Sequence, residues 1–178
     1  MSKVTLKDKT FKITIPADKI QKRIDEIASE MNRELKAKNP LFIVILNGAF
    51  LFASDLIKKI KIDCEVTFVR VASYNGTEST GKIRNLLGLH ENVHNRNLVI
   101  IEDIVDRGET IHFLLTEIHK FNPADVKIIT LLLKPAALKF PVELDYVGFE
   151  VPNDFLVGYG LDYDGMGRNL NDIYVLES

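Results

Sequence analysis

The hydrophobic positions of the chain follow two alternating patterns. Short runs dominated by aliphatic residues have the length and composition of buried parallel strands, which are covered on both faces. These runs are Leu41–Leu46, Leu98–Ile104 and Val126–Leu132. Between them, apolar residues recur at the 3.6-residue period of a helix. Strands that alternate with helices predict an α/β fold, a doubly wound and mostly parallel sheet.

Three helices and a further strand are predicted from this spacing. The longest helix follows Pro16 and has one apolar face, formed by Ile20, Ile24, Ile27, Met31 and Leu35. The other two cover Ala49–Ile60 and Glu109–Phe121. Ile62–Val71 alternates and is rich in β-branched residues, which favours a strand.

The two ends of the chain have a different pattern. Lys3–Leu6 and Phe11–Ile15 predict a hairpin. The C-terminal part has short strands, such as Tyr146–Phe149 and Leu156–Tyr159, between glycine-rich joints. We expect these ends to form a small hood subdomain. The expected division of one domain, 1–178, is a core of about 17–139, a hood of about 1–16 and 140–178, and a lid loop of about 73–89.

The lid loop is predicted from the absence of a packing pattern. Residues 73–89, SYNGTESTGKIRNLLGL, are rich in glycine and small polar side chains. A loop of this length is either disordered or functional. Gly76 and Gly81 would supply the hinges of a lid, and the residues alone leave a disordered loop as the alternative.

The most distinctive stretch is LVIIEDIVDRGET, residues 98–110. Its carboxylates, Glu102, Asp103 and Asp106, follow a predicted strand at the carboxyl end, where open α/β sheets bind ligands. A glycine and a threonine then lead into a helix, whose free N–H groups favour a phosphate. The acids suit sugar hydroxyls or a metal ion. The fragment Asp-x-Gly-x-Thr alone is equally consistent with a turn and a helix cap.

Composition narrows the class of protein. The 178 residues are 46% hydrophobic and 27% charged, as in a globular enzyme. The net charge of −2 gives no positive field for nucleic acid. No apolar run approaches the ~20 residues that span a bilayer, and the charged N-terminus lacks a signal-peptide pattern. We expect a cytoplasmic protein with neither nucleic-acid nor membrane partners, and the single Cys64 excludes an internal disulfide.

Four segments of the chain share a family resemblance. They are LNGAFLFASDL, SYNGTESTGKI, the run at residues 98–110, and KPAALKFPVELDYVGFEVPNDFLVGYGLDYDGMGRNL. Together they resemble the hypoxanthine-guanine (6-oxopurine) phosphoribosyltransferases, of the type I phosphoribosyltransferase fold. The resemblance implies Mg²⁺-dependent transfer of the phosphoribosyl group of PRPP (5-phosphoribosyl 1-diphosphate) to N9 of hypoxanthine or guanine. It also implies the products IMP or GMP and pyrophosphate, and a homodimer or homotetramer.

The resemblance implies a role for each acid. Glu102 and Asp103 match the pair that holds the ribose 2′- and 3′-hydroxyls, often through Mg²⁺. Asp162 matches a further Mg²⁺ ligand on the pyrophosphate side, and carboxylate oxygens suit that metal. Asp106 matches the catalytic residue placed against N7 of the purine as general acid or base.

The resemblance also implies a 5′-phosphate loop formed by Arg107, Gly108, Glu109 and Thr110. Family members usually have threonine where this chain has Arg107. The arginine either strengthens phosphate binding or points outwards and pairs with Glu109. This departure puts the phosphate affinity in doubt rather than the reaction.

Two further segments match parts of the PRPP site. Leu46, Asn47 and Gly48 match the loop that contacts pyrophosphate, in which the family often has a cis peptide between the first two residues. A plain strand-to-helix turn is the alternative, because Asn-Gly is also good turn chemistry. The sequence leaves open whether this bond is cis. Ser73 and Tyr74 match the head of the lid that closes over PRPP.

The purine site is implied in the same way. Lys134 matches the donor to O6 of the base, and an ammonium, which only donates, favours a 6-oxo over a 6-amino group. Phe155 would stack on the base, Ile104 would line its other face, and the Leu156 carbonyl would accept from the 2-amino group of guanine. Arg168 would grip pyrophosphate, since guanidinium geometry suits two hydrogen bonds.

Two alternatives stay open from the sequence. One is a non-catalytic regulator that uses the fold to sense a nucleotide, and the other is an enzyme that prefers another base, such as xanthine. The presence of Asp106, Lys134 and Asp162 argues against the regulator, whereas Arg107 leaves room for it. The relative use of hypoxanthine, guanine and xanthine is not settled by these residues.

Overall fold

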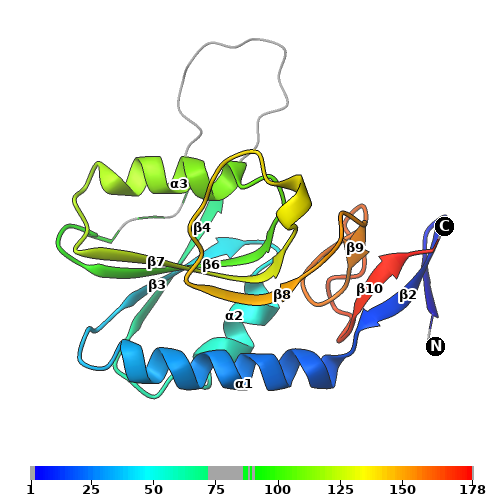
Figure 1. Cartoon of the computed structure of the whole chain (residues 1–178), viewed down its shortest axis with the longest axis horizontal. Coiled ribbons are helices and arrows are strands. Elements are labelled where there is room, and N and C mark those ends of the chain that lie inside the picture. The colour runs from blue at the N-terminus through cyan, green and yellow to red at the C-terminus, as the bar shows by residue number, and fades with distance from the viewer. Residues whose placement is uncertain (1–2, 72–85, 88, 90, 178) are drawn as a thin grey trace, which may run out of the picture.

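The structure is a computed structural model that describes residues 3–71, 86–87, 89 and 91–177 (Figure 1). Its larger sheet has six strands in the order β5-β4-β3-β6-β7-β8. These strands are β3 (Leu41–Leu46), β4 (Glu65–Val71), β5 (Leu86–Leu87), β6 (Asn97–Val105), β7 (Asp125–Leu133) and β8 (Tyr146–Glu150). All neighbours are parallel except β4 and β5. The predicted α/β fold with a mostly parallel sheet is therefore confirmed.

Helices cover both faces of this sheet, as a doubly wound fold requires. The helices are α1 (Ala17–Glu34), α2 (Phe50–Ile57) and α3 (Glu109–His119). In Figure 1, α1 and α2 lie on one side of the sheet and α3 on the other. Side chains alternate along a strand, so β3 contributes to both cores. Phe42 and Val44 pack with α1 and α2, whereas Leu41 and Ile43 pack with α3.

The predicted apolar face of α1 is buried against the sheet. It comprises Ile20, Ile24, Ile27 and Met31, followed by Leu35 just past the helix end. The first turn of the helix has N–H groups without partners inside the helix. One of them, the N–H of Ala17, donates to Oδ1 of Asp172 at 2.7 Å. The C-terminal segment therefore anchors the start of α1.

The two largest errors in the predicted boundaries are of three residues each. α2 ends at Ile57 rather than Ile60, and the last turn closes with a hydrogen bond from the Ile60 N–H to the Ile57 carbonyl. β4 begins at Glu65 rather than Ile62. Its partner β3 begins at Leu41, which lies opposite Glu65, so the ladder has no earlier residue to pair with.

A second, four-stranded sheet joins the two ends of the chain (Figure 1). Its order is β1-β2-β10-β9, and every pair is antiparallel. The strands are β1 (Lys3–Leu6), β2 (Lys9–Ile15), β9 (Leu156–Val157) and β10 (Ile173–Leu176). The N-terminal hairpin and the C-terminal segment therefore lie in one sheet, and we call this part of the protein the hood.

One strand that the sequence analysis placed in the hood belongs to the large sheet. β8 lies within 140–178, but it pairs with β7, with Tyr146 opposite Ile129. Gly148 allows this close approach, because a Cβ there would lie 2.4 Å from the Leu131 carbonyl oxygen of β7. The hood therefore takes the C-terminal segment only after β8. A five-residue strand does not show in its own sequence which sheet it joins.

Of the predicted lid, 73–89, only Leu86, Leu87 and Leu89 are described, and the first two form β5. Ser73 and Tyr74 lie outside the described residues. The lid therefore stays a prediction.

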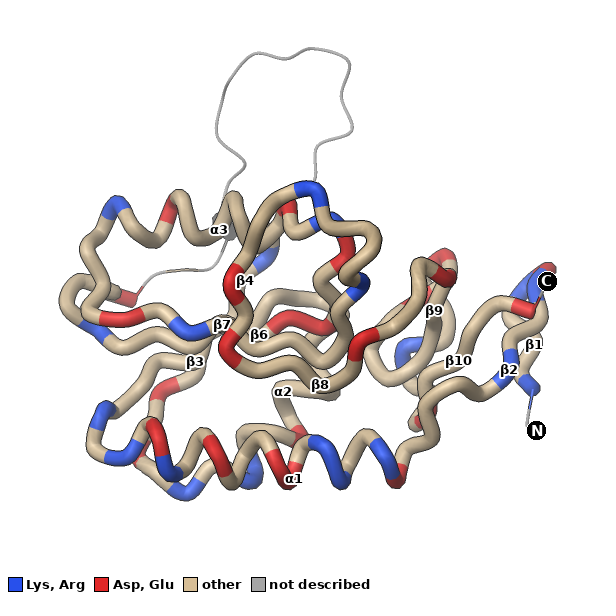
Figure 2. Tube along the Cα trace, viewed as in Figure 1, with Lys and Arg blue, Asp and Glu red and all other residues tan. Residues whose placement is uncertain are grey.

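Charges of both signs are mixed over the molecule. Figure 2 shows acidic and basic residues interspersed along α1 and in the hood, in keeping with the net charge of −2. Within the described ranges, no helix combines the length and the apolar composition needed to cross a membrane.

Candidate active site

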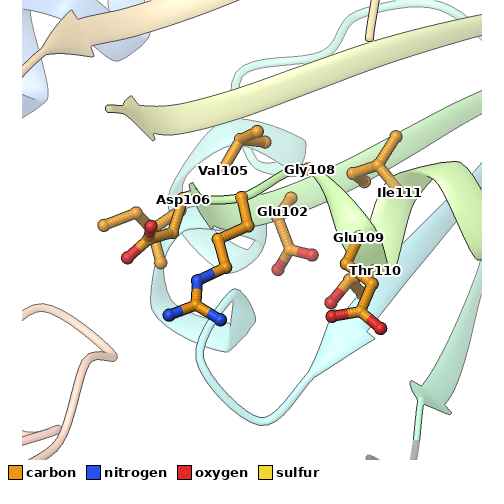
Figure 3. Close-up of a pocket in the computed structure, with 9 residues that line it drawn as sticks. Glu102, Val105, Asp106, Gly108, Glu109, Thr110 and Ile111 are labelled. Atoms are coloured by element: carbon orange, nitrogen blue, oxygen red, sulfur yellow. The ribbon is translucent and has the colours of Figure 1, made fainter. Parts of the chain in front are cut away.

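The carboxyl end of β6 and the loop that follows it line a cavity of about 420 Å³ (Figure 3). Its walls are formed by Glu102 and residues 104–111. In Figure 3 the side chains of Glu102, Glu109 and Thr110 extend to the same side of the chain. The distinctive run of the sequence therefore borders a cavity at the sheet edge where open α/β folds bind ligands.

The loop before α3 is held by the segment that follows β7. The Arg107 carbonyl accepts hydrogen bonds from the N–H groups of Lys139 and Phe140, both at 3.1 Å. Gly108 has a φ of +78°, and a Cβ there would lie 2.7 Å from the Phe140 carbonyl oxygen, so glycine is required. No described side chain caps α3. The first turn of α3 therefore offers N–H groups and a positive dipole end to an anion in the cavity.

Glu102 and Asp103 form a partly buried acidic pair. Glu102 is only 5% exposed, and its burial, together with the nearby Asp103 carboxylate, raises the pKa of Glu102 well above its usual value. The Asp103 N–H donates to Oε1 of Glu102 at 3.1 Å. A Cβ on Gly48 would lie 1.6 Å from Oδ2 of Asp103. Asp103 thus packs directly on the predicted pyrophosphate loop, and only glycine leaves room for its carboxylate.

The raised pKa of Glu102 leads to a prediction about stability. As the pH rises above the usual value of about 4.5, the unfolded chain ionises Glu102 before the folded chain does. The free energy of unfolding therefore falls until the pH exceeds the folded-state pKa. A Glu102→Gln variant has no carboxyl to ionise at this position, so it avoids this loss of unfolding free energy. In metal-free buffer with a chelator, we expect the variant to melt at a higher temperature than the wild type at pH 8, with a smaller difference at pH 4.

The exposed Glu26 of α1 provides the control for this melting experiment, since a Glu26→Gln variant should lack the pH-dependent gain. A Glu102→Gln variant that melts below the wild type at pH 8 would show that the buried carboxyl stabilises the fold instead.

Lys134 and Asp106 form an ion pair at the same end of the sheet. Lys134 directly follows β7, and its side-chain Nζ lies 3.0 Å from Oδ2 of Asp106. Lys134 is 8% exposed, whereas Asp106 is half-buried and lines the cavity. The backbone N–H of Lys134 donates to the Val105 carbonyl at 2.9 Å. A buried ammonium is therefore fixed beside a carboxylate that reaches the cavity.

The loop after β3 contacts the hood. The peptide bond between Leu46 and Asn47 is cis, which resolves the question that the sequence left open. The Asn47 side-chain oxygen accepts from Arg70 of β4 at 2.7 Å. A Cβ on Gly160 would lie 2.0 Å from the Gly48 carbonyl oxygen, so these two backbones are in close contact.

Arg168 and Asp162 of the hood adjoin this contact. Arg168 donates through one terminal nitrogen to the Gly160 carbonyl at 2.7 Å, and its other terminal nitrogen lies 2.6 Å from Oδ1 of Asp162. The second Asp162 oxygen accepts from the Gly165 N–H at 2.7 Å. The hood thus brings a guanidinium and a carboxylate to the backbone that faces Gly48.

Comparison with known proteins agrees with this arrangement. The phosphoribosyl transferase domain model matches residues 16–164. The chain belongs to the phosphoribosyl transferase family. Its fold is the one that the sequence resemblance implied.

Individual relatives give the same assignment. The hypoxanthine-guanine phosphoribosyltransferase of Bacillus subtilis is 43% identical over 168 residues, which cover 93% of each chain. The bifunctional protein TilS/HprT of Listeria innocua is also 43% identical, over 167 residues. The match covers 93% of this chain but only 26% of that longer protein. A crystal structure of a hypoxanthine phosphoribosyltransferase from Staphylococcus aureus superposes with a TM-score of 0.87 at 35% identity, over 93% of this chain and 91% of that one.

The carboxylates of this phosphoribosyl transferase suit Mg²⁺ only together with a substrate. Among the described residues, no three His, Cys, Asp or Glu side chains lie close enough to hold a metal by themselves. Glu102, Asp103 and Asp162 therefore do not form a single site. Mg²⁺ usually binds one or two carboxylates plus substrate oxygens and water, and the repulsion within the buried Glu102–Asp103 pair is what a cation would relieve.

The two hood residues that the sequence analysis assigned to the purine, Phe155 and Leu156, lie outside the described cavity lining. Phe155 is 45% exposed, and its ring packs edge-on against Tyr163 at 5.8 Å and lies 6.2 Å from Phe11. Leu156 is buried at the start of β9. Ile104, by contrast, lines the cavity. The structure therefore brings together Glu102, Asp106, the predicted phosphate loop and Lys134, and keeps Phe155 in an aromatic cluster of the hood.

Sequence reasoning missed two residues that contact the predicted site. Arg70 is the penultimate residue of β4, next to β3, and donates to Asn47. Its place at the carboxyl end of a strand parallel to β3 is the signal that would have found it. Gly160 packs on Gly48. The Gly-Tyr-Gly sequence around it indicates an unusual backbone, but it does not indicate the partner.

Proposed function

We propose that this protein is a purine-salvage enzyme that transfers the 5-phosphoribosyl group of PRPP to N9 of hypoxanthine or guanine. The products are IMP or GMP and pyrophosphate, and the reaction needs Mg²⁺. The main support is the ion pair of Lys134 and Asp106 beside the acid-lined cavity. O6 and N7 of a 6-oxopurine are neighbouring acceptors on one edge of the ring, so a donor and an acid–base group that serve both must lie next to each other.

The 5′-phosphate binds at the start of α3 in this proposal. Residues 107–110 border the cavity and supply N–H groups, the Thr110 hydroxyl and the Arg107 side chain. Glu102 and Asp103 hold the ribose hydroxyls. The leaving pyrophosphate lies by Gly48, where Arg168 and Asp162 supply a cation and a second carboxylate. Mg²⁺ held by the substrate together with either the Glu102–Asp103 pair or Asp162 would offset the charge that develops on the leaving pyrophosphate.

The transition state carries positive charge on the ribose between two anions. Little covalent chemistry is required of the protein, so positioning and charge placement supply most of the acceleration. Asp106 holds or accepts the proton at N7, and Lys134 donates to O6. Phe155 stacks on the base opposite Ile104, the Leu156 carbonyl accepts from the 2-amino group of guanine, and the lid headed by Ser73 and Tyr74 excludes water. We expect a cytoplasmic homodimer or homotetramer.

The direct test is a turnover assay with PRPP, Mg²⁺ and one purine at a time. We expect an absorbance change with hypoxanthine and with guanine, release of pyrophosphate, and much slower turnover with adenine. Excess chelator should abolish the reaction, and added Mg²⁺ should restore it. Binding of PRPP without turnover of any base would favour a non-catalytic regulator. Turnover of xanthine alone would favour an enzyme that prefers xanthine.

A further inference from the structure

We propose that Tyr159 is a positioning residue for the pyrophosphate side of the site. Its hydroxyl, bound to Asp55 of α2, holds the backbone of Gly160 against Gly48 and thereby places Arg168. The inference rests on the proposed function, since it concerns the same reaction, but it assigns a role to a side chain that does not reach the substrate.

Tyr159 is tied to α2 through a compact polar network. The ring is 4% exposed, and its hydroxyl donates to Oδ2 of Asp55 at 2.6 Å. Gln21 of α1 donates to the same oxygen at 2.7 Å, and Lys58 donates to the other oxygen at 2.7 Å. Burial alone would raise the pKa of Asp55, but the hydrogen bonds from Lys58, Tyr159 and Gln21 outweigh it and lower the pKa. The acceptor is thus a carboxylate, which makes the bond from Tyr159 a strong one.

The backbone around Tyr159 depends on such an anchor. Gly158, Tyr159 and Gly160 have φ values of +100°, +48° and +100°. Glycine adopts this region readily, whereas a bulky residue such as tyrosine is an outlier there. The conformation of Tyr159 persists because its surroundings hold it: its hydroxyl binds Asp55, and its N–H donates to the Leu170 carbonyl at 2.8 Å.

The next residue places the groups that face pyrophosphate. Gly160 exchanges two hydrogen bonds with Arg168: its N–H donates to the Arg168 carbonyl at 2.9 Å, and its carbonyl accepts from the guanidinium at 2.7 Å. The same guanidinium pairs with Asp162. A rotation of the backbone at Tyr159 would therefore move both charged groups.

Asp55 links the hood segment at Tyr159 to the loop that contains Gly48. α2 begins two residues after Gly48, so the helix that presents Asp55 also follows directly from the pyrophosphate loop. Gly48 and Gly160 are already in close backbone contact. The hydrogen bond between Tyr159 and Asp55 thus ties the hood segment around Gly160 to α2, the helix that also follows the loop around Gly48.

The test compares two tyrosines with matched environments. Tyr146 is also 4% exposed, and its hydroxyl donates to Oε2 of Glu34 at 2.5 Å, but it lies in β8. In Tyr159→Phe we expect the KM for PRPP and the inhibition constant of magnesium pyrophosphate to rise about tenfold. The KM for hypoxanthine should change less than about twofold. Both variants should lower the melting temperature by similar amounts. Tyr146→Phe should leave both KM values and the inhibition constant of magnesium pyrophosphate unchanged.

Asp55→Asn provides a second variant that keeps the shape and removes the charge, and it should shift the same two constants in the same direction. Equal effects of Tyr159→Phe and Tyr146→Phe, or a rise in the hypoxanthine KM as large as that for PRPP, would overturn the inference. The wild-type assay separates the two proposals. A wild type without turnover refutes the proposed function, whereas an active wild type with an unaltered Tyr159→Phe variant refutes only the role of Tyr159.

Discussion

An Asp106→Asn variant should lose about 10²- to 10⁴-fold in kcat, the range of a positioned general acid or base. Asparagine has the size of aspartate and still offers an oxygen to Lys134, but it neither accepts nor supplies a proton at N7 of the purine. Asp106 lies at the cavity 3.0 Å from Lys134, so its loss acts where the base is proposed to bind. Steady-state rates with saturating PRPP and hypoxanthine measure the effect.

The fold offers a matched control for this variant. Asp145 forms an ion pair with Lys127 at 2.9 Å, at the opposite end of β7 from Lys134. An Asp145→Asn variant should retain kcat within about twofold, even where it melts at a lower temperature. An Asp106→Asn enzyme that turns over at a near-normal rate would remove the acid–base role and leave Asp106 as the partner of a buried lysine.

The parts of the fold that were predicted correctly have strong local signals. β3 and the first half of β6 are buried on both faces, so their sequences contain unbroken apolar runs. α1 has one apolar face at a clean helical period, and every residue of that face is buried. Residues 102–108, at the end of β6 and in the loop after it, combine three acids with a glycine before a helix, and this combination predicted a ligand site where the structure has a cavity.

The features that sequence reasoning missed depend on partners far away in the chain. The start of β4 is set by where β3 begins, and β8 joins the large sheet because of its contact with β7. Gly160 contacts Gly48, which lies more than 100 residues earlier in the chain. Neither residue type nor spacing encodes such a pairing. The roles predicted for Lys134 and Arg168 therefore come from the family resemblance, and the role proposed for Tyr159 comes from the structure.

Lys134→Gln should change which purine the enzyme accepts. Lysine only donates, so it matches a 6-oxo group, whereas the glutamine amide both donates and accepts and therefore tolerates a 6-amino group. We expect kcat/KM for hypoxanthine to fall about 10- to 100-fold, the value of one hydrogen bond to a charged group. The ratio of kcat/KM for hypoxanthine to kcat/KM for adenine should fall as well. Competition assays with hypoxanthine and adenine in one mixture measure this ratio directly.

The ratio separates two ways in which Lys134 can act. Loss of the ammonium also removes the charge partner of Asp106, which lies 3.0 Å away, and that effect slows the reaction with every purine alike. A change in the ratio of hypoxanthine to adenine therefore reports the contact with O6 alone. Lys127→Gln, which breaks the ion pair with Asp145, is the matched control and should leave the ratio unchanged. If Lys134→Gln reacts more slowly with both hypoxanthine and adenine and the ratio of the two stays constant, Lys134 acts only through Asp106. The selection between the two bases must then depend on other residues of the site.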